Sequence, residues 1–401
     1  MTDRITHLIH HPYQPPGGFE APQAGVFKAS TVFFPTVAAM RSREWKDKSA
    51  YTYGLHGTPT SYALEERLAT LEGGAECLLV PSGLAALGLV AMSLLKSGDE
   101  VLVPDNAYGP NKSIVEGELK GWGITHQYYD PMDPQDLEAQ ISSRTKLVWL
   151  EAAGSVTLEF PNLVEMVRIC QRRKVLTALD NTWGAGLAFN AFDLVPGAQV
   201  PVAVDISAHA LTKYPSGGGD VLMGSVVTRN PSLHLKLKLT HMRFGIGVGM
   251  NDVEAVLRSL PTIGLRYRAH DVATRALAVW AQTQPEFVQV LHPALPKSPG
   301  HGHWMALTGG EEGTAAGLFS VMLDARFTQA QTDAFCDALK LFKLGYSWGG
   351  PISLVVPYEL ETMRTAWPAH LLPGTLVRFS VGLEDAADLQ ADIAQALEVL
   401  R

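Results

Sequence analysis

Short apolar runs alternate with amphipathic segments through the middle of the chain. Runs of strand length lie at residues 76–80, 101–103, 124–129, 146–150 and 175–179. Between the last two, apolar residues in 163–170 keep the spacing of one helix face. Alternation of this kind predicts a mostly parallel sheet with right-handed crossovers, in which ligands bind at the carboxyl ends of the strands. We therefore expect an α/β fold.

The pattern changes towards both ends of the chain. The N-terminal segment is rich in proline and glycine and shows no sustained period, so we expect an arm that lies on a neighbouring subunit. After about residue 255 a long helical stretch, 253–282, is followed by strands near 318–322 and 376–379. We expect three parts: an extended arm over 1–60, a large domain over 61–255 and a smaller α/β domain over 256–401.

Composition narrows the classes of function. The 401 residues carry a net charge of -8, which argues against a nucleic-acid or anionic-membrane surface as partner. We find neither an N-terminal signal core nor an apolar run long enough to span a membrane, so we expect a cytoplasmic protein. The cysteines, Cys77, Cys170 and Cys336, are far apart and indicate small core residues. We predict no metal site.

A lysine and an acid provide the most specific chemistry. Lys213 lies on a strand-like segment that runs into the glycine-rich turn 215–220, and Asp180 closes the apolar run 175–179. A pyridoxal phosphate enzyme needs an amine to bind the cofactor and a carboxylate to keep its pyridine nitrogen protonated. The alternatives are a structural lysine and a helix-capping aspartate. Because both residues are expected at neighbouring strand ends, we predict a pyridoxal phosphate enzyme.

Other candidates complete such a site. Ser82, Gly83 and Leu84 open a helix directly after a strand, where backbone N–H groups bind phosphate, although many such turns have this composition. Tyr108 follows another strand and either stacks on a cofactor ring or is a turn residue. Arg378, on an apolar strand, either binds a substrate carboxylate or forms a structural ion pair.

With these residues identified, the chain resembles the cystathionine β-lyases and their relatives, the cysteine and methionine metabolism family of fold-type I pyridoxal phosphate enzymes. The likeness covers nearly the whole chain. The motifs are Tyr53-Gly, Gly57-Thr-Pro-Thr60, Leu71-Glu-Gly-Gly74, Pro81-Ser-Gly-Leu-Ala-Ala86, Leu179-Asp-Asn-Thr-Trp183, Thr212-Lys-Tyr214, His292-Pro-Ala-Leu-Pro296, Tyr346-Ser-Trp-Gly-Gly350 and the stretch from Arg378 to Asp385.

The resemblance implies a fold-type I architecture with a seven-stranded, mostly parallel sheet and a smaller C-terminal α/β domain. It implies that Lys213 binds pyridoxal 5'-phosphate covalently, that Asp180 pairs with the pyridine nitrogen and that Tyr108 stacks on the ring. The residues implied at the phosphate are Ser82, Gly83, Leu84, Thr212 and, from a neighbouring subunit, Tyr53. The likeness also implies a homotetramer, a dimer of dimers whose active sites are shared between subunits.

For the substrate, the resemblance implies a small sulfur amino acid whose α-carboxylate binds Arg378. It also implies that Ser347, Trp348, Tyr53 and His56 contact the substrate. Ser347 and Trp348 belong to a stretch that looks more like the β-lyases than the γ-lyases or γ-synthases. The implied reaction is carbon–sulfur β-elimination, giving a thiol, pyruvate and ammonia. The alternatives are γ-elimination or γ-replacement on the same scaffold, or a non-catalytic regulator of this fold.

One position departs from the family pattern. An arginine usually stands two places after Tyr53, where it contacts phosphate and the far carboxylate of cystathionine, but this chain has Leu55 there, followed by His56. The lost contact would have been charge-assisted and worth roughly 1.5 to 3 kcal/mol. We expect His56 to replace the arginine in part, and the choice between cystathionine and other cysteine S-conjugates stays open.

Overall fold

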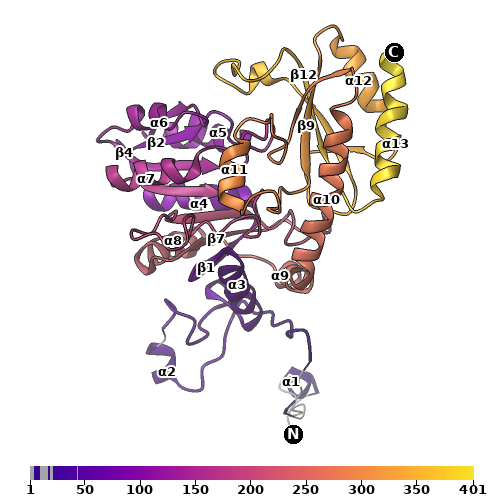
Figure 1. Cartoon of the computed structure of the whole chain (residues 1–401). Helices are drawn as coiled ribbons and strands as arrows, with labels where there is room; N and C mark the ends of the chain where they lie inside the picture. Colours follow the sequence, from indigo (N-terminus) through magenta and orange to yellow (C-terminus); the bar gives the residue numbers. More distant parts are fainter. Residues whose placement is uncertain (1–3, 10–16, 19–20, 43) are drawn as a thin grey trace.

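Two β-sheets, of seven and five strands, organise the chain (Figure 1). The computed structural model describes residues 4–9, 17–18, 21–42 and 44–401. Figure 1 shows the larger sheet and its helices on the left, the smaller sheet on the upper right and the N-terminal segment projecting below. Within the described residues, no helix has both the length and the apolar composition that crossing a membrane requires.

The seven-stranded sheet has the strand order β1-β7-β6-β5-β4-β2-β3, and β7 alone among these strands runs antiparallel to its neighbours. This confirms the predicted sheet. Its strands are β1 (Glu76–Val80), β2 (Glu100–Pro104), β3 (Thr125–Tyr129), β4 (Thr145–Glu151), β5 (Leu176–Asp180), β6 (Ile206–Ala210) and β7 (Gly224–Thr228).

Helices cover both faces of this sheet. Alternate residues of a strand belong to two separate apolar clusters, as Leu102 and Val103 of β2 do, because successive side chains point to opposite faces. Both faces are therefore buried, which explains the continuous apolar runs in the sequence. The helices are α3 (Pro59–Glu72), α4 (Gly83–Leu94), α5 (Gly109–Ile114), α6 (Pro134–Gln140), α7 (Leu163–Arg173), α8 (Pro231–Phe244) and α9 (Met250–Ser259).

The smaller sheet has the order β10-β11-β12-β9-β8. Its strands are β8 (Phe287–Leu291), β9 (Leu318–Asp324), β10 (Lys343–Leu344), β11 (Leu354–Tyr358) and β12 (Gly374–Ser380). The helices of this part are α10 (Ile263–Ala281), α11 (His301–Thr308), α12 (Gln329–Ala338) and α13 (Ala386–Leu397).

The helical stretch expected over 253–282 is present, and a short turn divides it into two helices. Helix α9 ends at Ser259, a 3-10 turn covers Leu260–Thr262, and α10 begins at Ile263. Pro261 lies in that turn; since proline has no N–H and clashes with the preceding turn, an α-helix is interrupted there.

The N-terminal part is more regular than the sequence predicts, since it contains α1 (Arg4–Ile9), α2 (Val37–Arg41) and a 3-10 turn, η1 (Gly54–His56). It projects from the body of the chain (Figure 1). Within it Phe33 is 94% exposed, an unusual state for so large an apolar side chain. Contact of this arm with a neighbouring subunit stays a prediction.

Candidate active site

A cavity of about 250 Å³ opens at the carboxyl edge of the large sheet. Residues from the ends of β4, β5 and β6 meet there with the start of α4 and a loop of the smaller part. Most of the candidates chosen from the sequence line it: Ser82, Gly83, Leu84, Tyr108, Asp180, Thr212, Lys213, Ser347 and Trp348. The fold thus brings residues from distant parts of the chain to one place.

Lys213 lies in a turn rather than on a strand. Strand β6 ends at Ala210, whose carbonyl accepts the N–H of Lys213 at 3.1 Å, so the expectation of a strand-like position was wrong. Its Nζ donates to Oγ of Ser347 at 3.1 Å and lies 4.5 Å from the centroid of the Trp348 ring. Burial and the charge of Arg378 lower the pKa of Lys213 to about 8. An amine in this state is a usable nucleophile and base near neutral pH.

Asp180 is the last residue of β5, as the apolar run predicts. Its Oδ1 accepts the backbone N–H of Thr182 at 3.1 Å. Burial raises the pKa of Asp180, against the opposing effects of that hydrogen bond and of the charges of His209 and Lys213. Burial prevails in the cofactor-free chain, and the charges of His209 and Lys213 act in the direction of the ionised form, which a protonated pyridine nitrogen requires.

Glu151 is a candidate that the sequence reasoning missed. It ends β4 directly beside Asp180 in the sheet register and lines the same cavity. Its side chain is buried, and burial together with the charge of Asp180 raises its pKa to about 8. The sequence pattern that predicted Asp180 also applies to Glu151, because Glu151 directly follows the strongly apolar run 146–150.

The start of α4 lines the cavity with Ser82, Gly83 and Leu84. Oγ of Ser82 accepts the N–H of Ala85 at 3.0 Å and caps the helix, which confirms the predicted cap. The first N–H groups of a helix have no partner within it and carry its positive dipole, so they attract phosphate. A Cβ on Gly83 would lie 2.5 Å from Cβ of Ala210, so only glycine allows α4 to approach β6 this closely.

Arg378 lies beside the cavity on β12 and is 4% exposed. Its Nη1 donates to the carbonyl of Ser155 at 2.7 Å. The guanidinium carbon lies 5.1 Å from the centroid of Trp348 and 5.2 Å from that of Tyr358, so two aromatic faces hold the group. The recorded acceptor is a carbonyl, which leaves the positive charge available for a carboxylate from outside the chain.

Tyr108 and Tyr53 lie in different places. Tyr108 precedes α5 and lines the cavity of Lys213, where burial raises its pKa. Tyr53, Leu55 and His56 line another cavity, of about 600 Å³, that Met250 also lines. Within one chain the structure does not bring this group to Lys213, so a contribution from a neighbouring subunit stays a prediction.

The residues around Lys213 fit pyridoxal phosphate. One cavity is lined by a buried amine with a lowered pKa, an acid at a strand end and a helix N-terminus. These are the groups that bind the aldehyde, the ring nitrogen and the phosphate of this cofactor. Thr212, in the turn after β6, also lines the cavity; its hydroxyl donates to the Met223 carbonyl at 3.3 Å and keeps its acceptor capacity. The fold and the site therefore define a pyridoxal phosphate enzyme of fold type I.

Comparisons with known proteins support the assignment to pyridoxal phosphate enzymes. Residues 5–398 match the family described as Cys/Met metabolism PLP-dependent enzymes. A protein of Rhizobium johnstonii described as a putative cystathionine beta-lyase is 39% identical over 98% of this chain and 94% of its own length. The cystathionine beta-lyase of Salmonella typhimurium is 35% identical over 92% of this chain and 91% of its own.

A solved structure supports the same assignment. The crystal structure of metB from Corynebacterium glutamicum superposes with a TM-score of 0.83 at 26% identity, covering 99% of this chain and 98% of that one. This chain belongs to the Cys/Met metabolism family of PLP-dependent enzymes. The predicted family, fold class and cofactor are thereby confirmed.

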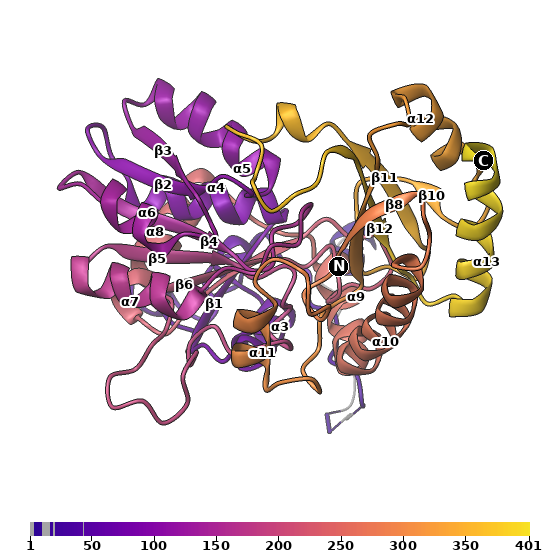
Figure 2. The ribbon, with the colours of Figure 1, turned by 45° about the horizontal axis from the view of Figure 1, so that its top comes forward.

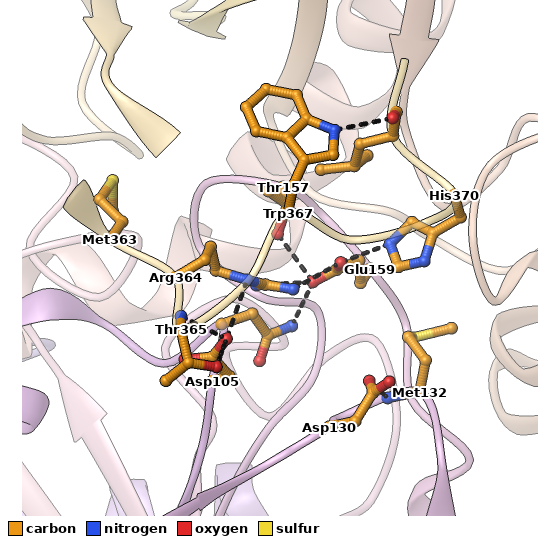
Figure 3. Close-up of polar contacts among 12 residues, drawn as sticks. Asp105, Asp130, Met132, Thr157, Glu159, Met363, Arg364, Thr365, Trp367 and His370 are labelled. Carbon is orange, nitrogen blue, oxygen red and sulfur yellow. Dashed lines mark hydrogen bonds and ion pairs between the residues drawn. The ribbon is translucent and has the colours of Figure 1, made fainter. Parts of the chain in front are cut away.

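A second polar cluster, which the sequence does not predict, is built around the buried Glu159 (Figure 3). Both carboxylate oxygens of Glu159 bond the guanidinium of Arg364, at 2.9 and 3.1 Å, and Oε1 also meets Nε2 of His370 at 2.5 Å. Asn106 and Thr157 each donate to Oε2 at 2.8 Å. We call Glu159, Arg364 and His370 the ion cluster.

The ion cluster joins the two parts of the chain. Arg364 lies in the loop between β11 and β12, which Figure 2 shows reaching across to α5. In the same loop, the N–H and Oγ1 of Thr365 donate to Oδ2 of Asp105 at 3.0 and 2.9 Å. Lys112 of α5 donates to the carbonyl of Met363 at 2.7 Å. Since Asp105 starts the loop that carries Tyr108, these contacts fix that loop to the smaller part.

Proposed function

We propose that this chain is a carbon–sulfur β-lyase that acts on cystathionine or a related cysteine S-conjugate. The observation that carries the proposal is the placement of the Lys213 amine on Ser347 and over Trp348, with Arg378 on the same indole. Ser347 and Trp348 belong to the stretch whose sequence is more similar to the β-lyases. The relatives named cystathionine beta-lyase at 35 to 39% identity support the same reaction.

Each residue has a chemical task in this reaction. Bound pyridoxal phosphate supplies an electron sink for the pair left at the α-carbon. Arg378 holds the α-carboxylate, and the uncharged Lys213 removes the α-proton. The sulfur leaves with the electrons of the C–S bond, and Lys213 returns a proton to it. The three-carbon remainder hydrolyses to pyruvate and ammonia.

The complete site needs more than one chain in this proposal. Ser82, Gly83, Leu84 and Thr212 would bind the phosphate from one subunit, and Tyr53 would reach it from another. His56 would approach the substrate from that side too. We therefore propose a homotetramer, built as a dimer of dimers, as the active form. The 46% exposure of Tyr53 in the single chain supports its availability to a partner.

The test is the identity of the product. We expect wild-type enzyme to release pyruvate and one thiol per turnover from cystathionine, cystine or an S-alkyl cysteine. Lys213→Ala should lose roughly 10²- to 10⁴-fold in rate, the usual contribution of a positioned acid–base group. Lys120→Ala, an exposed lysine, is the matched control.

Other outcomes select other activities. Release of 2-oxobutyrate from cystathionine would replace the proposal by γ-elimination, the chemistry nearest to that of a relative named cystathionine gamma-synthase. Conversion of L-alanine to its enantiomer, without pyruvate release, would favour the activity of a relative named L-alanine/L-glutamate racemase. Full turnover by Lys213→Ala would refute the mechanism itself.

A further inference from the structure

Glu151 connects three parts of the candidate site. Its Oε2 accepts the backbone N–H of Tyr108 at 2.8 Å, and its Oε1 accepts that of Ser155 at 2.9 Å. The carbonyl of Ser155 in turn accepts Nη1 of Arg378 at 2.7 Å. One carboxyl group thus holds the residue expected on the cofactor ring and, through the backbone of Ser155, the residue expected on the substrate.

The third connection is to Asp180. Residues 151 and 180 are partners in the register of β4 and β5, which run parallel. Partners in adjacent parallel strands direct their side chains to the same face of the sheet. Both side chains line the cavity of Lys213. Glu151 therefore stands beside the acid that would face the pyridine nitrogen.

The surroundings of the two acids differ in charge. Asp180 is influenced by the positive charges of His209 and Lys213, whereas the groups that favour ionised Glu151 are the N–H donors of Tyr108 and Ser155 and the side chain of Ser155. Two buried carboxylates this close cannot both ionise without cost. Both oxygens of Glu151 serve as acceptors for backbone N–H groups, whereas the positive charges lie at Asp180, which would face the ring nitrogen.

We propose that Glu151 is a positioning residue that holds the Tyr108 loop and the Arg378 guanidinium in place around Asp180. The proposal rests on the proposed roles of Tyr108 and Arg378. Its contacts are made to backbone groups, so it sets where these residues stand without touching the substrate. Replacing Glu151 should loosen the Tyr108 loop and the Arg378 guanidinium at once, although these lie far apart in the sequence.

The first test uses cofactor-free protein and needs no turnover. Glu151→Ala removes both acceptors, and Glu151→Gln keeps the length but offers one acceptor oxygen to two N–H groups. Hydrogen exchange followed by mass spectrometry should show about tenfold faster exchange in peptides covering 105–110 and 153–157 for Glu151→Ala, as expected for a lost buried hydrogen bond. Glu151→Gln should lie between that variant and the wild type.

Two controls complete the exchange test. The peptide over α7 should exchange as in the wild type, which excludes general loosening of the fold. Glu165→Gln, the same chemical change at a partly exposed site on α7, should leave both site peptides unchanged. Unchanged exchange of both site peptides in the two Glu151 variants would overturn the proposal, and so would faster exchange throughout the chain.

The second test separates positioning from mere stability. We expect Glu151→Ala to weaken pyridoxal phosphate binding about tenfold and to raise the KM for the amino acid about tenfold, each the effect of one misplaced contact. A purely structural role would lower the amount of active enzyme and leave KM unchanged, which would refute the proposal. If β-elimination fails in the wild type, exchange and cofactor binding still decide the role of Glu151.

Discussion

Glu151 and Glu159 are the same kind of side chain and both are buried; Glu151 is the last residue of β4, and Glu159 lies in the loop that follows it. Burial and the charge of Asp180 raise the pKa of Glu151 to about 8. For Glu159 burial acts in the same direction, but the hydrogen bond from His370 and the charge of Arg364 outweigh it and lower the pKa to about 2. The partners, rather than the depth, decide the charge state.

The difference separates two uses of a buried acid. Glu159 is surrounded by donors and two basic side chains, so its charge is compensated and it fastens the two parts of the chain together. Glu151 and Asp180 lie beside each other next to a cavity. Acids with perturbed pKa values in a cavity are typical of functional sites, whereas compensated ones are typical of architecture.

Breaking the ion cluster should have the largest effect on stability. Glu159→Ala removes the carboxylate that bonds the buried Arg364 at 2.9 Å and leaves it, among the residues that the structure describes, only the longer contact with Asp105, at 3.6 Å. Removal of one partner of a buried ion pair costs roughly 3 to 5 kcal/mol. We expect that loss in the free energy of unfolding, measured with urea at fixed protein concentration. Glu165→Ala removes a surface ion pair with Arg172 and should cost less than about 1 kcal/mol. Equal effects of the two changes would contradict the comparison.

Asp180→Asn should lower activity but not stability, the opposite of Glu159→Ala. An amide at position 180 cannot stabilise a protonated ring nitrogen, so kcat/KM should fall roughly 10²- to 10³-fold, as on removal of one preorganised electrostatic contact. The free energy of unfolding of cofactor-free protein should not fall, since the change removes the Asp180 charge that disfavours ionisation of Glu151. Asp333→Asn, an exposed acid on α12, serves as the control for both measurements. A stability loss like that of Glu159→Ala would show that Asp180 is structural.

The sequence predicted the groups whose positions follow from strand ends. The run 175–179 places Asp180 at the edge of a parallel sheet, and Ser82 after 76–80 indicates the start of α4. The same reasoning applied to 146–150 would have found Glu151. The break between α9 and α10 was also readable, because Pro261 lies within the expected helix.

The ion cluster was beyond such reasoning. Glu159 and Arg364 are separated by 205 residues, and they meet only because the loop between β11 and β12 reaches across to the larger part of the chain (Figure 2). No local spacing or periodicity records that contact. For the same reason the sequence could not show that the carbonyl of Ser155 accepts a hydrogen bond from Arg378. Nor could it show that Gly83 is needed for the close approach of α4 to β6.

The two glutamates should also shift stability with pH in opposite directions. The pKa of Glu159 in the folded chain, about 2, is below its ordinary value of 4.5, so its stabilisation is complete above about pH 4.5 and is lost as the pH falls towards 2. The loss should be roughly 3 kcal/mol, because one pKa unit corresponds to about 1.4 kcal/mol. The pKa of Glu151 is raised to about 8, so ionisation of the unfolded chain above about pH 4.5 progressively destabilises the fold until that value is reached.

Urea unfolding of cofactor-free protein between about pH 3 and about pH 9 measures both effects. The free energy of the wild type minus that of Glu159→Gln should fall only on the acid side. The corresponding difference for Glu151→Gln should be largest in acid and decrease towards pH 8, because the amide does not ionise. If both free-energy differences changed in the same direction with pH, both acids would be compensated alike. Glu151 would then be a structural acid like Glu159 rather than part of the candidate active site.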